Sequence, residues 1–260
     1  KDGATITVTD TGVEKDGSLK IEGVTVTTKG VTIDGSAVAT ATLDITGSDK
    51  ADTIKGGAGD DHLAGGKGAD MLYGGAGANT FKVATEGVDS VAKVIAAADS
   101  IMDWAAGAGN KIDGAADVAG EKAYGEFSVN DKGVVTFGNS SLTLDQMVNM
   151  LNDGLADTAG SVLFTHGSDS YVFSNDDATT SDILVKIAGV TNITDLHDIL
   201  AGSRTGIGDG DRELQAAAVA GDVAHLLGEG GVAQAVAKGI DNFLVIVDEA
   251  LIGGSLIELV

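Results

Sequence analysis

Residues 47–82 read GSDKADTIK GGAGDDHLA GGKGADMLY GGAGANTFK, which is one nine-residue repeat written four times. Glycine opens every repeat, Asp or Asn stands at its sixth position, and an apolar residue stands at its eighth. The sixth positions are Asp52, Asp61, Asp70 and Asn79, and the eighth positions are Ile54, Leu63, Leu72 and Phe81. A fixed period predicts stacked structural units, because one unit cannot bury its apolar face alone. The alternative, a glycine-rich flexible linker, does not explain the matched apolar position.

The residues of each repeat suit a cation held in a turn. We expect glycine at positions one, two and four to adopt positive φ and to bring backbone carbonyls inward. The acid at position six adds a charged oxygen, and calcium takes about six to eight oxygens in flexible geometry. The last three residues of each repeat extend as a short strand. The candidate calcium residues are Asp49, Asp52, Gly57, Gly59, Asp61, Gly66, Gly68, Asp70, Gly75, Gly77 and Asn79, followed by Asp60.

The pattern G-G-x-G-x-D-x-U-x resembles the RTX (repeats-in-toxin, haemolysin-type) calcium-binding parallel β-roll. Two repeats make one coil in that family, so the resemblance implies that each turn stacks on the turn two repeats later. It implies one calcium ion between the turns of Asp52 and Asp70 and another between those of Asp61 and Asn79, about two or more ions in all. It also implies export by type I secretion machinery to the outside of a bacterial cell, where calcium folds the roll.

The composition agrees with an acidic, cation-binding protein. The chain has 260 residues, 39 acids against 16 bases, a formal charge of −23, 39 glycines, and neither Cys nor Pro. Such a charge disfavours nucleic acid and anionic membranes as partners, although solubility is a plainer reason for it. No disulfide can form, so bound metal is the candidate stabiliser. No apolar run suits a transmembrane helix, and a start at Lys1 without a leader leads us to expect a fragment.

The segments around the repeats predict a mainly β fold with some α. Residues 1–46 alternate apolar and polar side chains, which predicts short strands from either the end of a β-sandwich or a solenoid that continues into the roll. Hairpin turns are predicted at Asp16-Gly17 and Asp34-Gly35. The predicted segments are the β-rich segment 1–46, the β-roll 47–82, a roll cap 83–141, a helix–β-hairpin unit 142–202, and a second such unit with the tail, 203–260.

The expected cap contains DSIMDWAAGAGNKID at 99–113, which resembles the segment after the repeats in many RTX proteins. The open end of a roll leaves apolar side chains and backbone groups that something must cover. We expect Trp104, together with Ile101 and Ile112, to do this. A ligand-stacking platform is the alternative role for Trp104. Two further candidate calcium ligands lie in this phrase, Asp99 and Asp103.

Local signals place elements in the C-terminal half. Residues 124–137 predict a hairpin that turns at Asn130–Gly133. Thr143 and Gln146 match a capping box, and apolar residues at helical spacing predict a helix over 144–155 that stops at Gly154. The remaining expectations are a match between 167–177 and 239–249 that predicts two related units, a short helix over 191–201, and a flexible connector over 203–211.

The sequence contains no catalytic motif that we recognise. It lacks H-E-x-x-H, G-x-S-x-G and any cysteine nucleophile. The histidines, His62, His166, His197 and His225, are scattered. Paired acids such as Asp60-Asp61 are explained first by turn or calcium chemistry. We therefore expect no enzymatic activity from this region.

Three functions fit these features. The first is an extracellular structural module of a bacterial surface-layer (S-layer) protein or adhesin, which calcium folds and bridges to copies of itself or to other surface proteins. The second is the non-catalytic secretion and folding domain of an RTX hydrolase whose catalytic domain lies before Lys1. The third, a toxin C-terminus, fits less well because toxins usually carry longer repeat arrays.

Overall fold

The computed structural model describes residues 3–9, 17–22, 24, 26, 28–84, 87, 90–105, 107–115, 122–155, 160–175 and 182–201. All of them belong to one compact unit, Lys1–Gly206. The second unit, Ile207–Val260, lies outside the described residues. The connector 203–211, the segment 239–249 and the second helix–hairpin unit therefore stay predictions.

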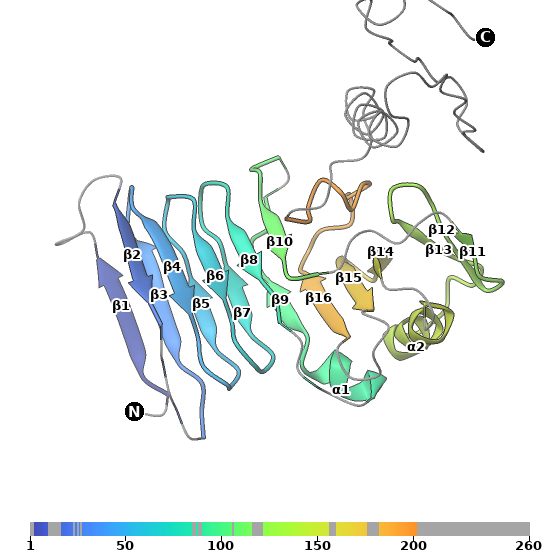
Figure 1. Ribbon diagram of the computed structural model, residues 1–260, viewed down its shortest axis with the longest axis horizontal. Coiled ribbons are helices and arrows are strands. Elements are labelled where there is room, and N and C mark those ends of the chain that lie inside the picture. The colour runs from blue at the N-terminus through green and yellow to red at the C-terminus, as the bar shows by residue number, and fades with distance from the viewer. Residues whose placement is uncertain are drawn as a thin grey trace, which may run out of the picture. The chain divides into compact units, whose positions relative to one another are not determined.

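Two parallel sheets face each other across the N-terminal half of the described chain (Figure 1). The first contains β1 (Thr5–Thr9), β3 (Thr32–Ala37), β5 (Thr53–Lys55), β7 (Met71–Tyr73) and β9 (Asp99–Ile101). The second contains β2 (Ser18–Ile21), β4 (Thr42–Thr46), β6 (His62–Ala64), β8 (Thr80–Lys82) and β10 (Lys111–Asp113). Odd and even strands alternate between the sheets, so the chain winds as a parallel β-roll, and the predicted fold class is confirmed.

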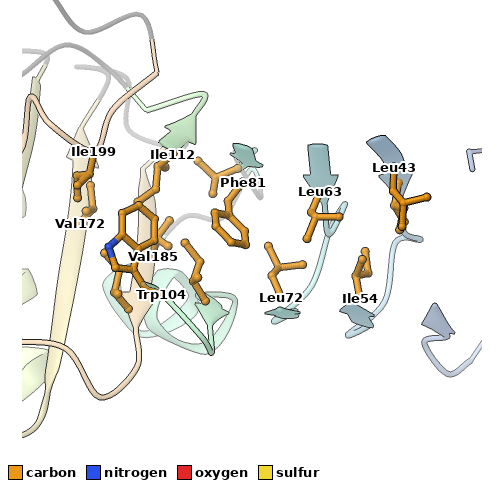
Figure 2. Close-up of a cluster of buried hydrophobic side chains, with 14 of the residues drawn as sticks. Leu43, Ile54, Leu63, Leu72, Phe81, Trp104, Ile112, Val172, Val185 and Ile199 are labelled. Atoms are coloured by element: carbon orange, nitrogen blue, oxygen red, sulfur yellow. The ribbon is translucent and has the colours of Figure 1, made fainter. Parts of the chain in front are cut away.

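The apolar residue of each strand points into the space between the sheets and explains the stack. One column runs through Ile33, Ile54, Leu72 and Ile101, and the facing column runs through Ile45, Leu63, Phe81 and Ile112. All eight are at most 1% exposed, and Figure 2 shows several of them side by side. Each buried aliphatic or aromatic side chain stabilises the fold by about 1.5–3 kcal/mol relative to an exposed one. The nine-residue period thus supplies one core side chain per strand.

The N-terminal segment belongs to the solenoid and not to a sandwich. Strand β1 pairs in parallel with β3, and β2 pairs in parallel with β4. The predicted hairpin at Asp34-Gly35 is therefore wrong, because neighbouring strands along the chain lie in different sheets. The hairpin predicted at Asp16-Gly17 falls on Asp16, which lies outside the described residues. Gly35 lies inside β3, where a Cβ atom would meet Leu43 Cδ1 at 2.3 Å. This glycine makes room for a core leucine instead of forming a turn.

Residues 99–113, which we predicted as part of a separate cap, form one more coil of the roll. β9 pairs in parallel with β7, and β10 pairs in parallel with β8. The short helix α1 (Val91–Ala96) precedes this coil. Ile101 and Ile112 extend the two core columns. The strands β9 and β10 thus continue the roll although the nine-residue spacing is lost here.

The true covering of the first sheet is an antiparallel hairpin and a third strand. β14 (Gly160–His166), β15 (Asp169–Asn175) and β16 (Ile183–Ile187) pair antiparallel, and β16 adds in parallel to β9. Trp104 is 8% exposed, lies in the same hydrophobic cluster as Val185 and Ile199, and has its ring centroid 6.0 Å from that of Phe81 (Figure 2). The predicted burial of Trp104 at the roll end is confirmed, and such burial leaves no open stacking platform.

A helix and a small sheet build a second core. The sheet consists of β11 (Lys122–Ala123), β12 (Phe127–Val129) and β13 (Val135–Phe137), and the helix α2 spans Leu144–Leu155. The predicted hairpin is confirmed, and Asn130 Oδ1 accepts the N–H groups of Lys132 and Val134 in its turn. The capping box is also confirmed, since Thr143 N donates to Gln146 Oε1 (2.9 Å) and Gln146 N to Thr143 Oγ1 (3.3 Å).

The predicted helix over 144–155 is confirmed as α2. Gly154 does not stop this helix, contrary to our prediction. It lies inside the helix, where a Cβ atom would meet the Phe127 ring at 2.6 Å. Its missing side chain lets the ring of β12 approach the helix. The glycine therefore reflects packing between α2 and the small sheet.

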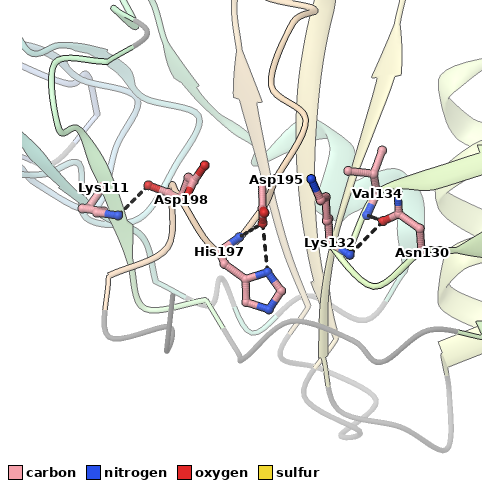
Figure 3. A network of polar contacts seen from close by, with 7 residues as sticks. All are labelled: Lys111, Asn130, Lys132, Val134, Asp195, His197 and Asp198. Atoms are coloured by element: carbon pink, nitrogen blue, oxygen red, sulfur yellow. Dashed lines mark hydrogen bonds and ion pairs between the residues drawn. The ribbon is translucent and has the colours of Figure 1, made fainter. Parts of the chain in front are cut away.

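The predicted helix over 191–201 is wrong, because this segment covers the edge of the second sheet. Ile112 N donates to Ile199 O (2.6 Å), and Ala201 N donates to Ile112 O (2.7 Å). Figure 3 shows the flanking contacts, in which Lys111 Nζ donates to Asp198 O and the segment passes Lys132. Its apolar residues Leu196, Ile199 and Leu200 are buried. Backbone pairing with β10 thus outweighs the helical spacing of these residues.

Candidate calcium site

The position-six side chains of the repeats are buried along the two edges where the roll turns. Asp52 is 2% exposed, Asp61 0%, Asp70 1% and Asn79 0%. Each precedes the core residue of its strand by two positions, so it lies where the turn becomes the strand. Acidic side chains are rarely buried to this extent without a partner. This burial defines the candidate site.

These side chains form two hydrogen-bonded columns. In the first, Asp52 Oδ1 accepts from Val31 N (2.6 Å), Asp70 Oδ1 from Asp52 N (2.7 Å), and Asp99 Oδ1 from Asp70 N (3.0 Å). In the second, Asp61 Oδ1 accepts from Leu43 N (2.8 Å), Asn79 Oδ1 from Asp61 N (2.9 Å), and Asn110 Oδ1 from Asn79 N (2.9 Å). The predicted stacking of each turn on the turn two repeats later is what these columns show.

Glycine at position one makes room for the carboxylate of its own repeat. A Cβ atom on Gly47 would lie 2.5 Å from Asp52 Oδ2, one on Gly56 would lie 2.5 Å from Asp61 Oδ2, and one on Gly65 would lie 1.9 Å from Asp70 Oδ2. These distances are far below a normal contact. Position one thus carries glycine for space, and the predicted positive φ at this position is wrong.

Glycines at positions two and four do adopt positive φ in the last two repeats. The φ angles are 103° at Gly66, 105° at Gly68, 80° at Gly75 and 85° at Gly77. Each of these glycines stacks on the backbone one coil earlier, as Gly66 does on Ser48 O. Gly57 and Gly59 stack on Val38 and Ala41 without positive φ, so the second repeat departs from the prediction.

The remaining candidate acids lie on the rim of the turns. Asp49 and Asp60 are exposed, and Asp60 Oδ1 accepts from Ala78 N (2.7 Å) one coil later. Asp103 is exposed and accepts from both Gly74 N (2.7 Å) and Gly75 N (2.9 Å). Asp99 is 7% exposed and belongs to the first column. The structure therefore brings Asp60 and Asp103 to the edge that carries Asp61.

Sequence reasoning missed Asn110. It is 5% exposed and completes the second column above Asn79. The signal was present, because Asn110 precedes the core residue Ile112 by two positions, as position six precedes position eight in every repeat. Asp99 stands in the same relation to Ile101.

The electrostatics of the edges favour a bound cation. Burial raises the pKa of Asp61 above its usual 3.8 and Asp60 adds to this, although the N–H groups of Leu43 and Gly57 oppose the shift. An ionised carboxylate in this place is costly, and a cation beside it would offset that cost. Among the described residues, no three His, Cys, Asp or Glu side chains gather at one point. The donors that the edges offer are carboxylates and turn carbonyls, which are the hard oxygens that calcium prefers.

The fold and these edges define a calcium-binding parallel β-roll. Residues 46–81 match the family model of the RTX calcium-binding nonapeptide repeat, so this part of the chain consists of four RTX repeats. No curated protein matches the chain. Within the part of the chain that the structure describes, no helix has the length and apolar character needed to cross a membrane.

Proposed function

We propose that this chain is an extracellular structural module of a type I-secreted bacterial cell-surface protein, either an S-layer protein or an adhesin, and that calcium folds it. The observation that carries the proposal is the buried column of acids in stacked glycine turns. RTX repeats are typical of secreted proteins. The absence of cysteine agrees with a fold that depends on metal instead of disulfides.

Calcium acts here as part of the folded state. One ion belongs between the turns 47–52 and 65–70, and another between 56–61 and 74–79, because these turns stack and carry the buried acids. Ordering a glycine-rich segment costs much conformational entropy. A ligand at about 100 times its dissociation constant contributes about 2.7 kcal/mol per site, which is enough to decide whether such a segment folds.

The proposed role is structural and non-catalytic. Several candidate acids accept hydrogen bonds from backbone N–H groups. Asp99 accepts from Asp70 N, and Asp60 accepts from Ala78 N. Asp103 accepts from Gly74 N and Gly75 N. Acids that are engaged in this way stabilise turns and are poorly placed to exchange protons with a substrate. The proposed partners are calcium, copies of the same protein or other surface proteins, and the type I secretion machinery.

The test is assembly of the full-length protein with and without calcium. We expect static light scattering and negative-stain electron microscopy to show ordered arrays or polymers in calcium and dispersed chains after EGTA. A protein that folds in calcium and stays monodisperse would contradict the surface-layer role. That result, together with hydrolase activity of the full-length protein, would favour the folding domain of a secreted hydrolase.

A further inference from the structure

A pocket of about 590 Å³ opens between α2 and the β12–β13 hairpin. None of the described residues that line it belongs to the β-roll. Its main lining residues are Glu126, Asn139, Leu142, Gln146, Asn149 and Met150. Figure 1 shows α2 beside the small sheet that carries the other wall. The volume lies in the range of small-molecule sites, about 300–1,000 Å³.

Three amide side chains in this pocket are each held by one local hydrogen bond. Gln146 Oε1 accepts from Thr143 N (2.9 Å), and Asn139 Oδ1 accepts from Ser141 N (2.9 Å). Asn149 Nδ2 donates to Asp145 O (2.6 Å). Among the described residues, nothing bonds their other polar atoms, Gln146 Nε2, Asn139 Nδ2 and Asn149 Oδ1. The pocket thus presents two donors and one acceptor whose positions are fixed in advance, which lowers the entropy cost of binding.

The chemistry of the lining selects a neutral, hydroxylated ligand. Sugar hydroxyls both donate and accept hydrogen bonds, so they match amide donors, an amide acceptor and the Glu126 carboxylate. Leu142 and Met150 supply apolar contact for the C–H faces of a sugar ring. Anions are disfavoured by Glu126 and by the charge of −23. Glu126 is the one acid among the described lining residues, and a single exposed carboxylate is too little to hold a cation firmly.

From this arrangement we propose that the α2 pocket is a binding site for a neutral saccharide. The inference does not depend on calcium or on the surface role, because the pocket lies outside the roll. Exposed lining and few donors predict weak, millimolar binding of a single sugar. Such sites gain strength when many copies bind one polymer.

Saturation-transfer NMR on the full chain in calcium tests the proposal. The probes are free glucose, galactose, mannose and N-acetylglucosamine, with N-acetylglycinamide as a peptide-like comparison. Gln146→Glu keeps the oxygen that caps α2 but replaces the Nε2 donor by an acceptor. We expect it to weaken binding of the preferred sugar about tenfold, the effect of one lost hydrogen bond. Asn149→Leu should act similarly.

Asp153→Asn is the matched control, because Asp153 is exposed on the same helix and does not line the pocket. It should bind as the natural protein does. Circular dichroism should show that all variants fold alike. The proposal is overturned if no sugar shows saturable transfer, if both lining variants bind unchanged, or if N-acetylglycinamide binds more tightly than every sugar.

Discussion

At the scale of residues, the first glycine and the sixth acid of a repeat act as a pair. The carboxylate folds back toward the start of its own turn, where Ser48 N and Gly57 N donate to Asp52 Oδ2 and Asp61 Oδ2. Only a residue without a Cβ atom fits between them. The pair sets the shape of the turn.

Gly56→Ala tests this pair. The new Cβ atom would lie 2.5 Å from both Asp61 Oδ2 and Gly74 O, so we expect destabilisation of about 1–3 kcal/mol. Circular dichroism measures the calcium concentration at the folding midpoint, and we expect this concentration to rise in the variant. Ala58→Ser, an exposed change in the same turn, is the control and should leave the midpoint in place.

The Asp61→Asn variant separates the energetic cost of burying the Asp61 charge from the contribution of that charge to calcium binding. The folded-state pKa of Asp61 is raised, so in the absence of calcium its ionised form destabilises the fold at neutral pH, and this penalty disappears as pH falls through the raised pKa toward 3.8. The calcium-free variant should therefore be more stable than the natural protein at pH 7, by an amount that vanishes in acid. In calcium the order should reverse. The folded fraction of both proteins, followed by circular dichroism at several pH values in EGTA and in calcium, measures both differences. A calcium-free variant with the smaller folded fraction at pH 7 would count against the raised pKa.

The candidate residues were predictable where the repeat is regular. Burial of Asp52, Asp61 and Asp70 follows from their fixed distance to a core residue. Asn110 escaped because the preceding turn has lost the nine-residue spacing, and only the relation to Ile112 survives. The space required at position one could not be predicted either. A glycine in a sequence does not show whether it is needed for a positive φ or because a Cβ atom would clash with a neighbour.

At the scale of elements, the coil 99–113 is held to the repeats by its own acid. Asp103 binds the amides of Gly74 and Gly75 from the next turn, at a point where the glycine pattern has ended. This carboxylate closes the last turn with hydrogen bonds to charged oxygen, which are stronger than neutral ones.

Asp103→Ala should loosen this turn by about 1 kcal/mol, since the carboxylate is exposed and the bonds are partly replaced by water. Amide exchange of Gly74 and Gly75 in calcium is the direct readout and should accelerate. Asp131→Ala, an exposed acid in the β12–β13 turn, is the control. Unchanged exchange at both glycines would show that the hydrogen bonds to Asp103 do not stabilise this turn.

The segment 191–201 gives the second prediction at this scale. Ala201→Pro removes the N–H group that donates to Ile112 O, whereas Ala201→Val keeps it. We expect only the proline variant to expose the β10 edge and to self-associate, because unpaired strand edges recruit other strands. Analytical ultracentrifugation compares the two. If the proline variant is monomeric at the same concentrations as the natural protein, the β10 edge does not need to be covered.

Elements were predictable when local signals decided them. The capping box fixed the start of α2, and the Asn130 turn fixed the β12–β13 hairpin. Pairing across the roll decided the rest: Asp34-Gly35 reads locally as a turn but lies in a strand, and the apolar spacing of Leu196 and Leu200 reads as a helix but serves an edge. Sequence periodicity cannot show which unpaired strand edge, distant in the sequence, a segment will pair with.

At the scale of the whole described unit, the acid-bearing turns occupy the middle of a longer roll. The residues equivalent to position six in the N-terminal coils are Val31 and Leu43, which are buried and uncharged. The C-terminal coil is closed by Asp103 and joined to β16. Calcium should thus act on the centre of the roll, between ends that pack through apolar contacts, hydrogen bonds and ion pairs.

Hydrogen–deuterium exchange of the full chain, with calcium and then with EGTA, tests this account most directly. We predict strong protection of residues 53–82 in calcium and its loss in EGTA, because the buried acids of the stacked turns then lack their cation. Magnesium, which demands tighter geometry, should not restore protection at the same concentration. Equal protection of residues 53–82 with and without calcium would contradict the claim that calcium folds the roll.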